Sequence, residues 1–498
     1  MRKISFAFVV ILFIGVSASA QTNKTESFEE YAARKKSEFN QYRVQKKTEF
    51  EQYRQRLNEE FAARLSGEWK QYKPESKQER AANPKPPKPS VVDKTKPTAP
   101  VKVPVKSVVP PEKKIADVPV TLPKIDRRKP AQEYPVRFNF YNTPCGIGEF
   151  DTSSLSFSST DNSAISKAWK RLTANDNIEP LLADCLRLRE EMQLCDWGFL
   201  QLVDKVAATL YPGSSDKQVF LATALMLQVG YDCRLLDVGG RLALAYHPSH
   251  TVYGQPCVKV DGKDYNVFGP LANELTGIRT YPGDFRKSPT PIRMAVDRYP
   301  RFSAPNPPAK TYSSASWTAA PPFELTVNKS VMDFFDTYPI VDWNLYGMAP
   351  VSPQIERTLF PVMQVLTEGL SEEEAVNVVM SYMNYGFKYM TDDGQFGREK
   401  PFFPDENFYY PYNDCEDRAI LFSRIVKQVL GLDAVYLFYP GHLAAAVKFS
   451  PGVNVKGATV DVDGVSYVVC DPTCIGAKAG YLHPNYAKQP VKVYKVAL

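Results

Sequence analysis

The sequence is poor in the residues that bind transition metals, and this limits the chemistry it can perform. Four of its 498 residues are histidines and eight are cysteines. It has no Cys-x-x-Cys pair and no histidine-rich cluster, so it does not predict a zinc site. The cysteines are too sparse for a small disulfide-stabilised scaffold, and their spacing does not reveal their pairing. We therefore expect neither a metal nor a cofactor.

Long apolar runs are also scarce. Residues 4–16 form the one conspicuous run, between the basic start of the chain and the small residues Ala18-Ser19-Ala20. This pattern is typical of a cleaved export signal, and the run is too short to span a bilayer well. We predict a signal peptide at residues 1–20, no transmembrane segment and a periplasmic or extracellular location. Export, with a net charge of only +6, also argues against a nucleic-acid partner.

Residues 21–73 predict one long charged helix. A phenylalanine recurs every 11 residues, and a tyrosine follows each of the first three after three residues; these are Phe28, Phe39, Phe50 and Phe61, with Tyr31, Tyr42 and Tyr53. An 11-residue period is about 3.67 residues per turn, so the rings form a nearly straight stripe on one helix. The stripe on the 28–72 helix is either the seam of a solvated helix or a surface for self-association or partner docking.

Two proline-rich stretches divide the rest of the chain. Residues 74–134 are rich in Pro, Lys and Val, which favours an extended polyproline II spacer or, alternatively, a ligand for a proline-binding groove. A second stretch, residues 302–322, separates two segments of globular composition. We expect these segments, 135–301 and 323–498, to be two domains.

The two globular segments contain a faint internal repeat. The segment from Ser214 to Asp232 aligns without a gap with the segment from Cys415 to Asp433. Each pattern predicts a helix that ends at a glycine and is followed by strands, and an Asp-Gly turn at 463–464 precedes a further strand. Helices followed by an antiparallel sheet predict an α+β fold with two tandem domains.

Three residues of the second segment form the candidate site: Cys415, His442 and Asp471. Asp414 is suited to cap a helix, which places Cys415 in the first turn, where the helix dipole favours a thiolate and free amides can bind an oxyanion. His442 opens a strand and Asp471 closes a neighbouring one, so the carboxylate can orient the imidazole. The trio therefore predicts a nucleophile, a base and an orienting acid.

The first segment has different residues at these three positions. Ser214 aligns with Cys415, Arg241 with His442 and Gly269 with Asp471. The first copy therefore lacks the nucleophile, the base and the orienting acid, and we expect it to be catalytically inert.

The order and spacing of the three residues resemble the transglutaminase-like superfamily of papain-like Cys-His-Asp thiol enzymes. The resemblance rests on the motifs 413–418, 439–442 and 470–474, and it covers 320–498 well and 135–290 weakly. It implies two tandem transglutaminase-like domains in an exported bacterial protein whose first copy is degenerate. It also implies a cysteine peptidase, an amidase or an acyltransferase, although the superfamily includes non-catalytic relatives.

The leading hypothesis is an exported thiol enzyme that acts on amide or peptide bonds of a protein or a cell-wall peptide. Hydrolysis is favoured over cross-linking because water is the default acceptor. Tyr410 and Tyr412 precede Cys415 and are candidates for the oxyanion hole or a substrate groove, although packing is the commoner role of such aromatic residues. The alternative is a non-catalytic binding or scaffolding protein of the cell envelope. A disulfide-linked repeat protein with no site is a third reading.

Overall fold

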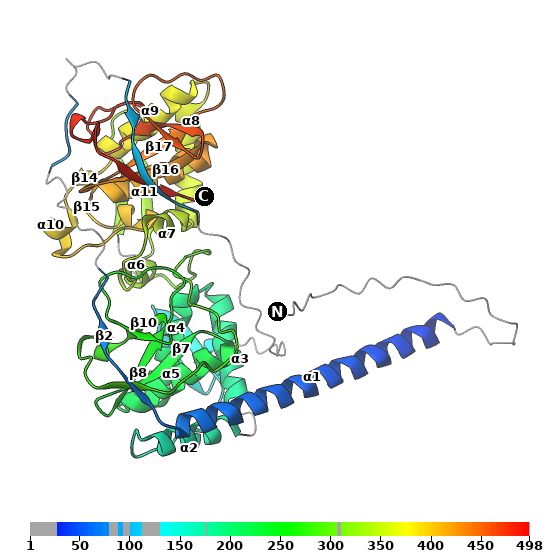
Figure 1. Ribbon diagram of the computed structural model, residues 1–498. Coiled ribbons are helices and arrows are strands. Elements are labelled where there is room, and N and C mark those ends of the chain that lie inside the picture. Colours follow the sequence, from blue (N-terminus) through cyan, green and yellow to red (C-terminus); the bar gives the residue numbers. More distant parts are fainter. Residues whose placement is uncertain are drawn as a thin grey trace, which may run out of the picture. The chain divides into compact units, whose positions relative to one another are not determined.

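The computed structural model describes residues 27–78, 88–92, 100–111, 130–174, 177–305 and 310–497. The predicted signal peptide at 1–20 lies outside them. The chain divides into one unit that ends at Arg56 and a second, larger unit, Leu57–Leu498. The described residues form a mixed α and β structure with an N-terminal helix and two seven-stranded sheets, as Figure 1 shows. This agrees with the predicted α+β class and is compatible with two domains.

The α-helices of the described chain are α1 (Phe28–Ser66), α2 (Asn162–Thr173), α3 (Ile178–Glu191), α4 (Asp196–Leu210), α5 (Ser215–Val229), α6 (Lys329–Asp336), α7 (Trp343–Met348), α8 (Pro353–Thr367), α9 (Glu372–Tyr385), α10 (Asp392–Phe396) and α11 (Cys415–Ile425). None of them is long and apolar enough to cross a membrane.

The first seven-stranded sheet contains β1 (Lys70–Tyr72), β2 (Pro74–Glu75), β7 (Cys233–Val238), β8 (Arg241–Tyr246), β9 (Cys257–Val260), β10 (Lys263–Phe268) and β11 (Ile278–Thr280). The second contains β3 (Lys102–Val103), β4 (Val105–Val109), β16 (Asp433–Tyr439), β17 (His442–Lys448), β18 (Thr459–Val462), β19 (Val465–Cys470) and β20 (Val491–Lys495). The short pairs are β5 (Val136–Phe140) with β6 (Thr143–Ile147), β12 (Lys310–Ser313) with β13 (Glu324–Val327), and β14 (Lys388–Tyr389) with β15 (Tyr412–Asn413).

The five inner strands of the two large sheets have the same order, whereas the two edge strands from the N-terminal segment are placed in the opposite order. The first runs β1-β11-β7-β8-β10-β9-β2, and the second, read from β4, runs β4-β20-β16-β17-β19-β18-β3. Within each sheet, the five inner strands pair with one another in antiparallel fashion. The helix before each sheet reaches a glycine in the left-handed conformation, Gly230 or Gly431, as the repeat predicted. The shared topology thus extends the repeat beyond the aligned sequence.

The predicted long helix is present as α1, but it ends earlier than expected. It stops at Ser66, and the next residues turn at Gly67 and enter β1, which pairs with β11. Phe61 in the last turns is buried against Trp169, with the ring centroids 4.6 Å apart. Gly67, directly after the helix, is a residue type that commonly ends helices, and the residues beyond it pair with a strand more than 200 residues away.

The described parts of the predicted spacer 74–134 include strands at the edges of both sheets. β2 pairs with β9 of the first sheet, whereas β3 and β4 run parallel to β18 and β20 of the second. Val103 is only 2% exposed and belongs to the apolar cluster of the second sheet. Pro104 lies between β3 and β4, where its carbonyl accepts a hydrogen bond from Val491 N–H and no donor is required. These parts of the segment are therefore not a free spacer.

The predicted linker 302–322 is also partly built into the structure. Its described residues include β12, which pairs with β13, and two buried aromatic residues, Phe302 and Trp317. The Trp317 ring packs on Tyr382 of α9 at 5.0 Å between centroids. Composition alone suggested a linker here, but the aromatic residues anchor this stretch to the core.

Candidate functional site

Cys415 is the first residue of α11, as the sequence predicted. Asp414 precedes the helix as its N-cap residue, and the Asp417 carboxylate accepts a hydrogen bond of 3.0 Å from Asp414 N–H. This hydrogen bond helps to fix the start of the helix. The helix packs against β16 and β17, and the Cys415 side chain is buried, with 1% of the residue exposed. The thiol therefore lies at the dipole-positive end of a helix that contacts the strand of His442.

His442 and Asp471 are in direct contact. His442 is the first residue of β17, and Asp471 follows the last residue of β19, the strand paired with β17. The distance from His442 Nε2 to Asp471 Oδ2 is 2.7 Å, and both side chains are buried. The other ring nitrogen, His442 Nδ1, is buried without a hydrogen-bond partner in the described part of the chain. The carboxylate thus orients an imidazole whose second nitrogen is available for proton transfer.

Asp471 is held in its ionised form by its neighbours. Burial alone would raise the pKa of its carboxyl group, but the His442 imidazole and hydrogen bonds from Thr473 N–H and the Cys474 thiol lower the pKa below its usual value. The same carboxylate raises the pKa of the Cys474 thiol, after the larger effect of burial. Cys470 and Cys474 are both free thiols, so the two cysteines that flank Asp471 do not pair with each other.

Tyr486 covers the imidazole and was not predicted from the sequence. Its ring is stacked on His442, with a centroid distance of 5.0 Å and an angle of 12° between the planes, and it also packs on Tyr439 at 4.9 Å. Burial raises the pKa of the Tyr486 hydroxyl, and its electrostatic interactions with Asp471 and Cys415 raise it further. Tyr486 is therefore within electrostatic range of both residues. It comes from the short 3₁₀ turn Pro484–Tyr486, which has no periodic pattern that would reveal it.

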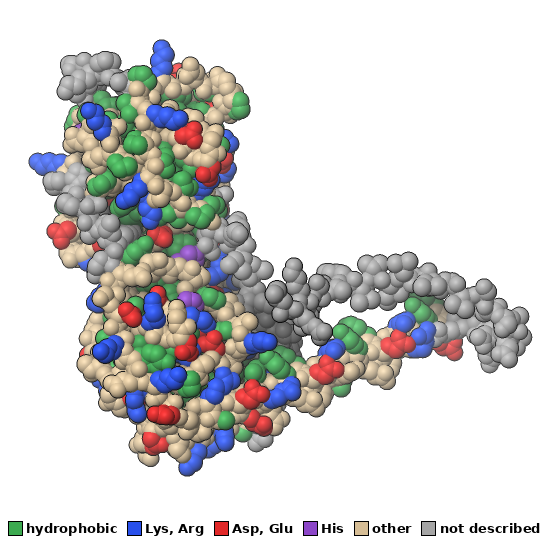
Figure 2. Space-filling model, in the orientation of Figure 1, with side chains coloured by type: hydrophobic (Ala, Val, Ile, Leu, Met, Phe, Trp, Pro, Cys, Tyr) green, Lys and Arg blue, Asp and Glu red, His purple; other side chains and the backbone are tan. Residues whose placement is uncertain are grey.

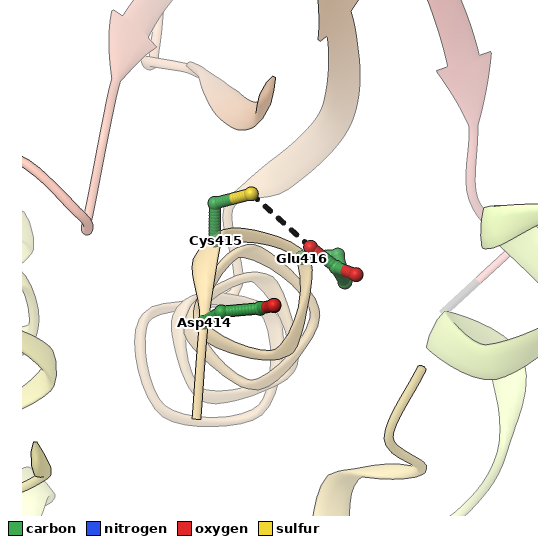
Figure 3. A group of neighbouring side chains, drawn as sticks. All are labelled: Asp414, Cys415 and Glu416. Atoms are coloured by element: carbon green, nitrogen blue, oxygen red, sulfur yellow. Dashed lines mark hydrogen bonds between the residues drawn. The ribbon is translucent and has the colours of Figure 1, made fainter. Parts of the chain in front are cut away.

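The Cys415 thiol donates a hydrogen bond to the carboxylate of its neighbour in the helix. The distance from Cys415 Sγ to Glu416 Oε2 is 3.1 Å, and Figure 3 shows the two side chains directed toward each other at the start of α11. Glu416 is buried, with 1% of the residue exposed. An ionised carboxylate at this distance repels a thiolate, so this contact stabilises the protonated thiol. Sequence reasoning missed Glu416 because adjacent helical residues do not normally face each other.

Several acidic groups around Cys415 lie close enough together to hold a metal ion. The three candidate groups are Asp414, Cys415 and Glu416; Asp392, Asp414 and Asp417; and Asp392, Glu399 and Glu416, each with one ligand atom per residue within 4.8 Å of the others. Three of these carboxylates already accept backbone amides: Asp417 from Phe402, Asp414 from Asp392, and Asp392 from Lys400. These bonds hold the loop after α10 against the start of α11, which is a structural role that needs no ion.

The two tyrosines proposed for the oxyanion hole lie in the loop before α11. Tyr410 is packed among aromatic rings, 5.0 Å from Phe396 and 5.1 Å from Phe402, and burial raises the pKa of its hydroxyl. Tyr412 belongs to β15, and its backbone exchanges two hydrogen bonds with the Gln395 side chain. Tyr410 is thus packed in an aromatic cluster and the Tyr412 backbone is held by Gln395, while the role of either tyrosine in an oxyanion hole stays a prediction.

Two of the three counterparts in the first copy occupy equivalent places, whereas Ser214 lies one residue before its helix and Cys415 is the first residue of α11. Ser214 precedes α5, Arg241 opens β8 as His442 opens β17, and Gly269 follows β10 as Asp471 follows β19. Arg241 is exposed and forms a 3.2 Å ion pair with Glu274. The alignment of the two copies therefore agrees with the order of the elements.

Comparison with family models, with curated proteins and with solved structures gave no match for this chain. The resemblance to transglutaminase-like enzymes therefore depends on the motif in the sequence. The structure brings His442 and Asp471 together and places Cys415 on the helix that packs against their sheet.

Proposed function

We propose that the protein is an exported thiol enzyme of the transglutaminase-like type, which acts on amide or peptide bonds through Cys415. The observation that carries this proposal is the buried pair of His442 and Asp471, with a distance of 2.7 Å from Nε2 to Oδ2 and an Nδ1 that has no hydrogen-bond partner among the described residues. A buried imidazole that is held by a carboxylate on one nitrogen and free on the other is suited to general-base chemistry.

In the proposed reaction, each side chain has one task. His442 Nδ1 takes the proton of the Cys415 thiol, and the thiolate attacks the carbonyl carbon of the amide to form a tetrahedral intermediate. Amides at the start of α11 stabilise its oxyanion, and Asp471 stabilises the imidazolium. The intermediate collapses to a thioester as His442 returns the proton to the departing amine. Water then attacks the thioester, with His442 again acting as the base, and releases the acid and the thiol.

The described arrangement requires an opening step before this chemistry. The Cys415 thiol donates to Glu416, and Tyr486 is stacked over His442. A substrate must displace Tyr486, and the Cys415 side chain must rotate from Glu416 toward the imidazole. Both changes involve side chains at the start of a helix and in a short turn, so they need no rearrangement of the sheet.

The alternative function, a non-catalytic binding or scaffolding protein of the cell envelope, is favoured by the same closed state. Cys415 is 1% exposed and His442 is 3% exposed, and a carboxylate lies beside the thiol. In this second candidate the three residues are retained as buried polar groups that stabilise the domain. The two candidates differ in whether Cys415 is reactive and whether its reactivity depends on His442.

Alkylation of the purified protein separates them. We expect iodoacetamide at about pH 6 to modify Cys415, as mapped by peptide mass spectrometry, because a base-assisted thiol reacts at a pH where ordinary thiols are protonated. His442→Ala should slow this modification by at least about tenfold. His250→Ala, which removes a histidine of the first half, serves as the matched control and should leave the rate unchanged. If Cys415 stays unmodified, or if it is modified at the same rate in His442→Ala as in His250→Ala, the result would support the non-catalytic alternative.

A further inference from the structure

The part of α1 that ends at Arg56 presents a stripe of exposed aromatic side chains. The exposed fractions are 83% for Phe28, 63% for Phe39 and 37% for Phe50, and the tyrosines Tyr31, Tyr42 and Tyr53 are 47 to 59% exposed. The fourth phenylalanine of the same 11-residue series, Phe61, is packed against three aromatic rings of the core. The same 11-residue series is therefore buried at Phe61, where the core covers the ring, and exposed at its three earlier phenylalanines. Exposed apolar stripes of this length are interaction surfaces.

The two edges of the stripe carry opposite charges. With 11 residues in three turns, the positions four and ten residues after each phenylalanine lie on opposite sides, each about 65° from the midline of the stripe. The first set is Ala32, Arg43 and Arg54, and the second is Glu38, Glu49 and Glu60. Figure 2 shows apolar, basic and acidic side chains together on the visible face of α1. One edge is thus acidic, and the other is basic in two of the three repeats.

This distribution of charge favours pairing with a second copy of the same helix in the parallel orientation. In a parallel pair, the acidic edge of each helix lies opposite the basic edge of the other, as at the flanking positions of a parallel coiled coil. In an antiparallel pair, like edges meet and like charges repel. We propose that the protein forms a homodimer in which the α1 helices of two copies pair in parallel and in register through the Phe28–Tyr53 stripe. This inference does not rest on the proposed enzymatic function.

The size of the stripe is sufficient for a stable dimer. Residues 28–56 span roughly 43 Å at the rise of an α-helix. Burying about half of each of the six rings in both copies removes on the order of 1,200 Å² from water, which reaches the range of specific interfaces. The 11-residue period keeps the two stripes in contact over this length without the left-handed supercoil of a heptad pattern.

Two lysines lie on the midline of the stripe, and their contacts show how it accommodates them. Lys35 is 2.8 Å from Glu38 and Lys46 is 2.7 Å from Glu49, so their ammonium groups are drawn to the acidic edge. Their side chains also pass over tyrosine rings, at 6.0 Å for Tyr31 and 5.8 Å for Tyr42. The aliphatic stems can then stay in the seam while the charges remain in water. A polar residue at such a position also fixes the register of a helical pair.

Sedimentation velocity of the purified protein tests the association. We expect the wild-type protein to sediment with the mass of two chains at micromolar concentrations, and the triple variant Phe28→Ala, Phe39→Ala, Phe50→Ala to sediment with the mass of one. The matched control replaces three exposed residues on the opposite side of the helix: Gln41→Ala, Val44→Ala and Gln52→Ala. This variant should remain dimeric, and circular dichroism of both variants should confirm that the domains are folded.

Oxidative cross-linking tests the orientation. In a parallel, in-register pair, Lys35 of each copy lies across the seam from Lys35 of the other, so Lys35→Cys should give a disulfide-linked dimer in non-reducing gels. Gln41→Cys, on the opposite face, should not. A monomeric wild-type protein, a dimer that survives the three phenylalanine substitutions, or a dimer that Lys35→Cys cannot cross-link would each overturn the proposal. Binding of the wild-type helix to anionic lipid vesicles as a monomer would overturn it as well.

Discussion

At the scale of single residues, Tyr486 covers the imidazole of the candidate site. Its ring lies parallel to the His442 imidazole at 5.0 Å, and a stacked aromatic pair of this kind contributes about 0.5–1.5 kcal/mol. We expect Tyr486→Ala to expose the imidazole and raise the rate of Cys415 alkylation by up to about tenfold. The measurement is the rate of iodoacetamide incorporation at Cys415.

The control for this prediction is Tyr467→Ala, which removes a half-buried tyrosine from β19 without touching His442. Its alkylation rate should equal that of the wild-type protein. If Tyr486→Ala reacted no faster than Tyr467→Ala, Tyr486 would be a packing residue and a different element would have to open the site.

We expect Asp405 to make the stability of the second half depend on pH. Burial raises the pKa of its carboxyl group from 3.8 to about 6, although Ser352 N–H donates to it at 3.1 Å. Because the pKa is higher in the folded state, the protonated carboxyl group contributes stability in full below about pH 4, and this contribution is lost as the pH rises through about 6. The total is about 2–3 kcal/mol.

An Asp405→Asn variant removes the titration but keeps the shape of the side chain. The free energy of unfolding in urea should fall between pH 4 and pH 7 by about 2–3 kcal/mol more in the wild-type protein than in the variant. A constant difference between the two proteins across this range would show that Asp405 does not titrate on unfolding.

At the scale of elements, a glycine ends the helix in each copy of the repeat. Gly431 has a φ of 72°, and no heavy atom lies within 4 Å of the Cβ that a substitution would add. Gly431→Ala should therefore destabilise the protein through its backbone conformation alone, and we expect it to lower the free energy of unfolding by about 1–2 kcal/mol. Gly431→Asn should cost less, because asparagine adopts the left-handed conformation more readily. Urea unfolding of the two variants measures both values, and equal values would contradict the backbone explanation.

Local patterns predicted the elements that carry the candidate site. The Asp414 cap and the helix-ending Gly431 bracket the helix region, and the Asp463-Gly464 turn, with both φ angles positive, sets the register of β18 and β19. These signals are local, so they could be read from the sequence. The contact between His442 and Asp471 followed because their strands are neighbours in the sheet.

Non-local features could not be predicted in the same way. β3 and β4 come from a segment whose composition favours an extended chain, and an extended chain becomes a strand only when a partner edge is present. Tyr486 belongs to a turn that follows Asp471 in the sequence, and its ring stacks on His442. The Glu416 carboxylate accepts a hydrogen bond from the Cys415 thiol because of the side-chain conformations of the two residues. None of these contacts leaves a periodic signal, because each depends on residues brought together by the completed fold.

At the scale of the whole molecule, the segment between α1 and the first globular half contributes edge strands to both large sheets. β1 and β2 flank the first sheet, and β3 and β4 flank the second. Edge strands protect the sheet beneath them from pairing with other chains. A truncation that removes everything before residue 135 therefore does more than remove a tether, because it uncovers β9, β11, β18 and β20.

The strongest test of this arrangement is a pair of substitutions in the same edge segment. Val103 is 2% exposed within the apolar cluster of the second sheet, whereas Val105 is 36% exposed. Val103→Asp buries an unpaired carboxylate and should lower the free energy of unfolding by about 3 kcal/mol or more, while Val105→Asp should change it by less than about 1 kcal/mol. If this segment were only a spacer, Val103→Asp and Val105→Asp would change the free energy of unfolding equally little. Deleting residues 100–111 should then reduce the soluble yield sharply, because the exposed edges of β18 and β20 become available to other chains.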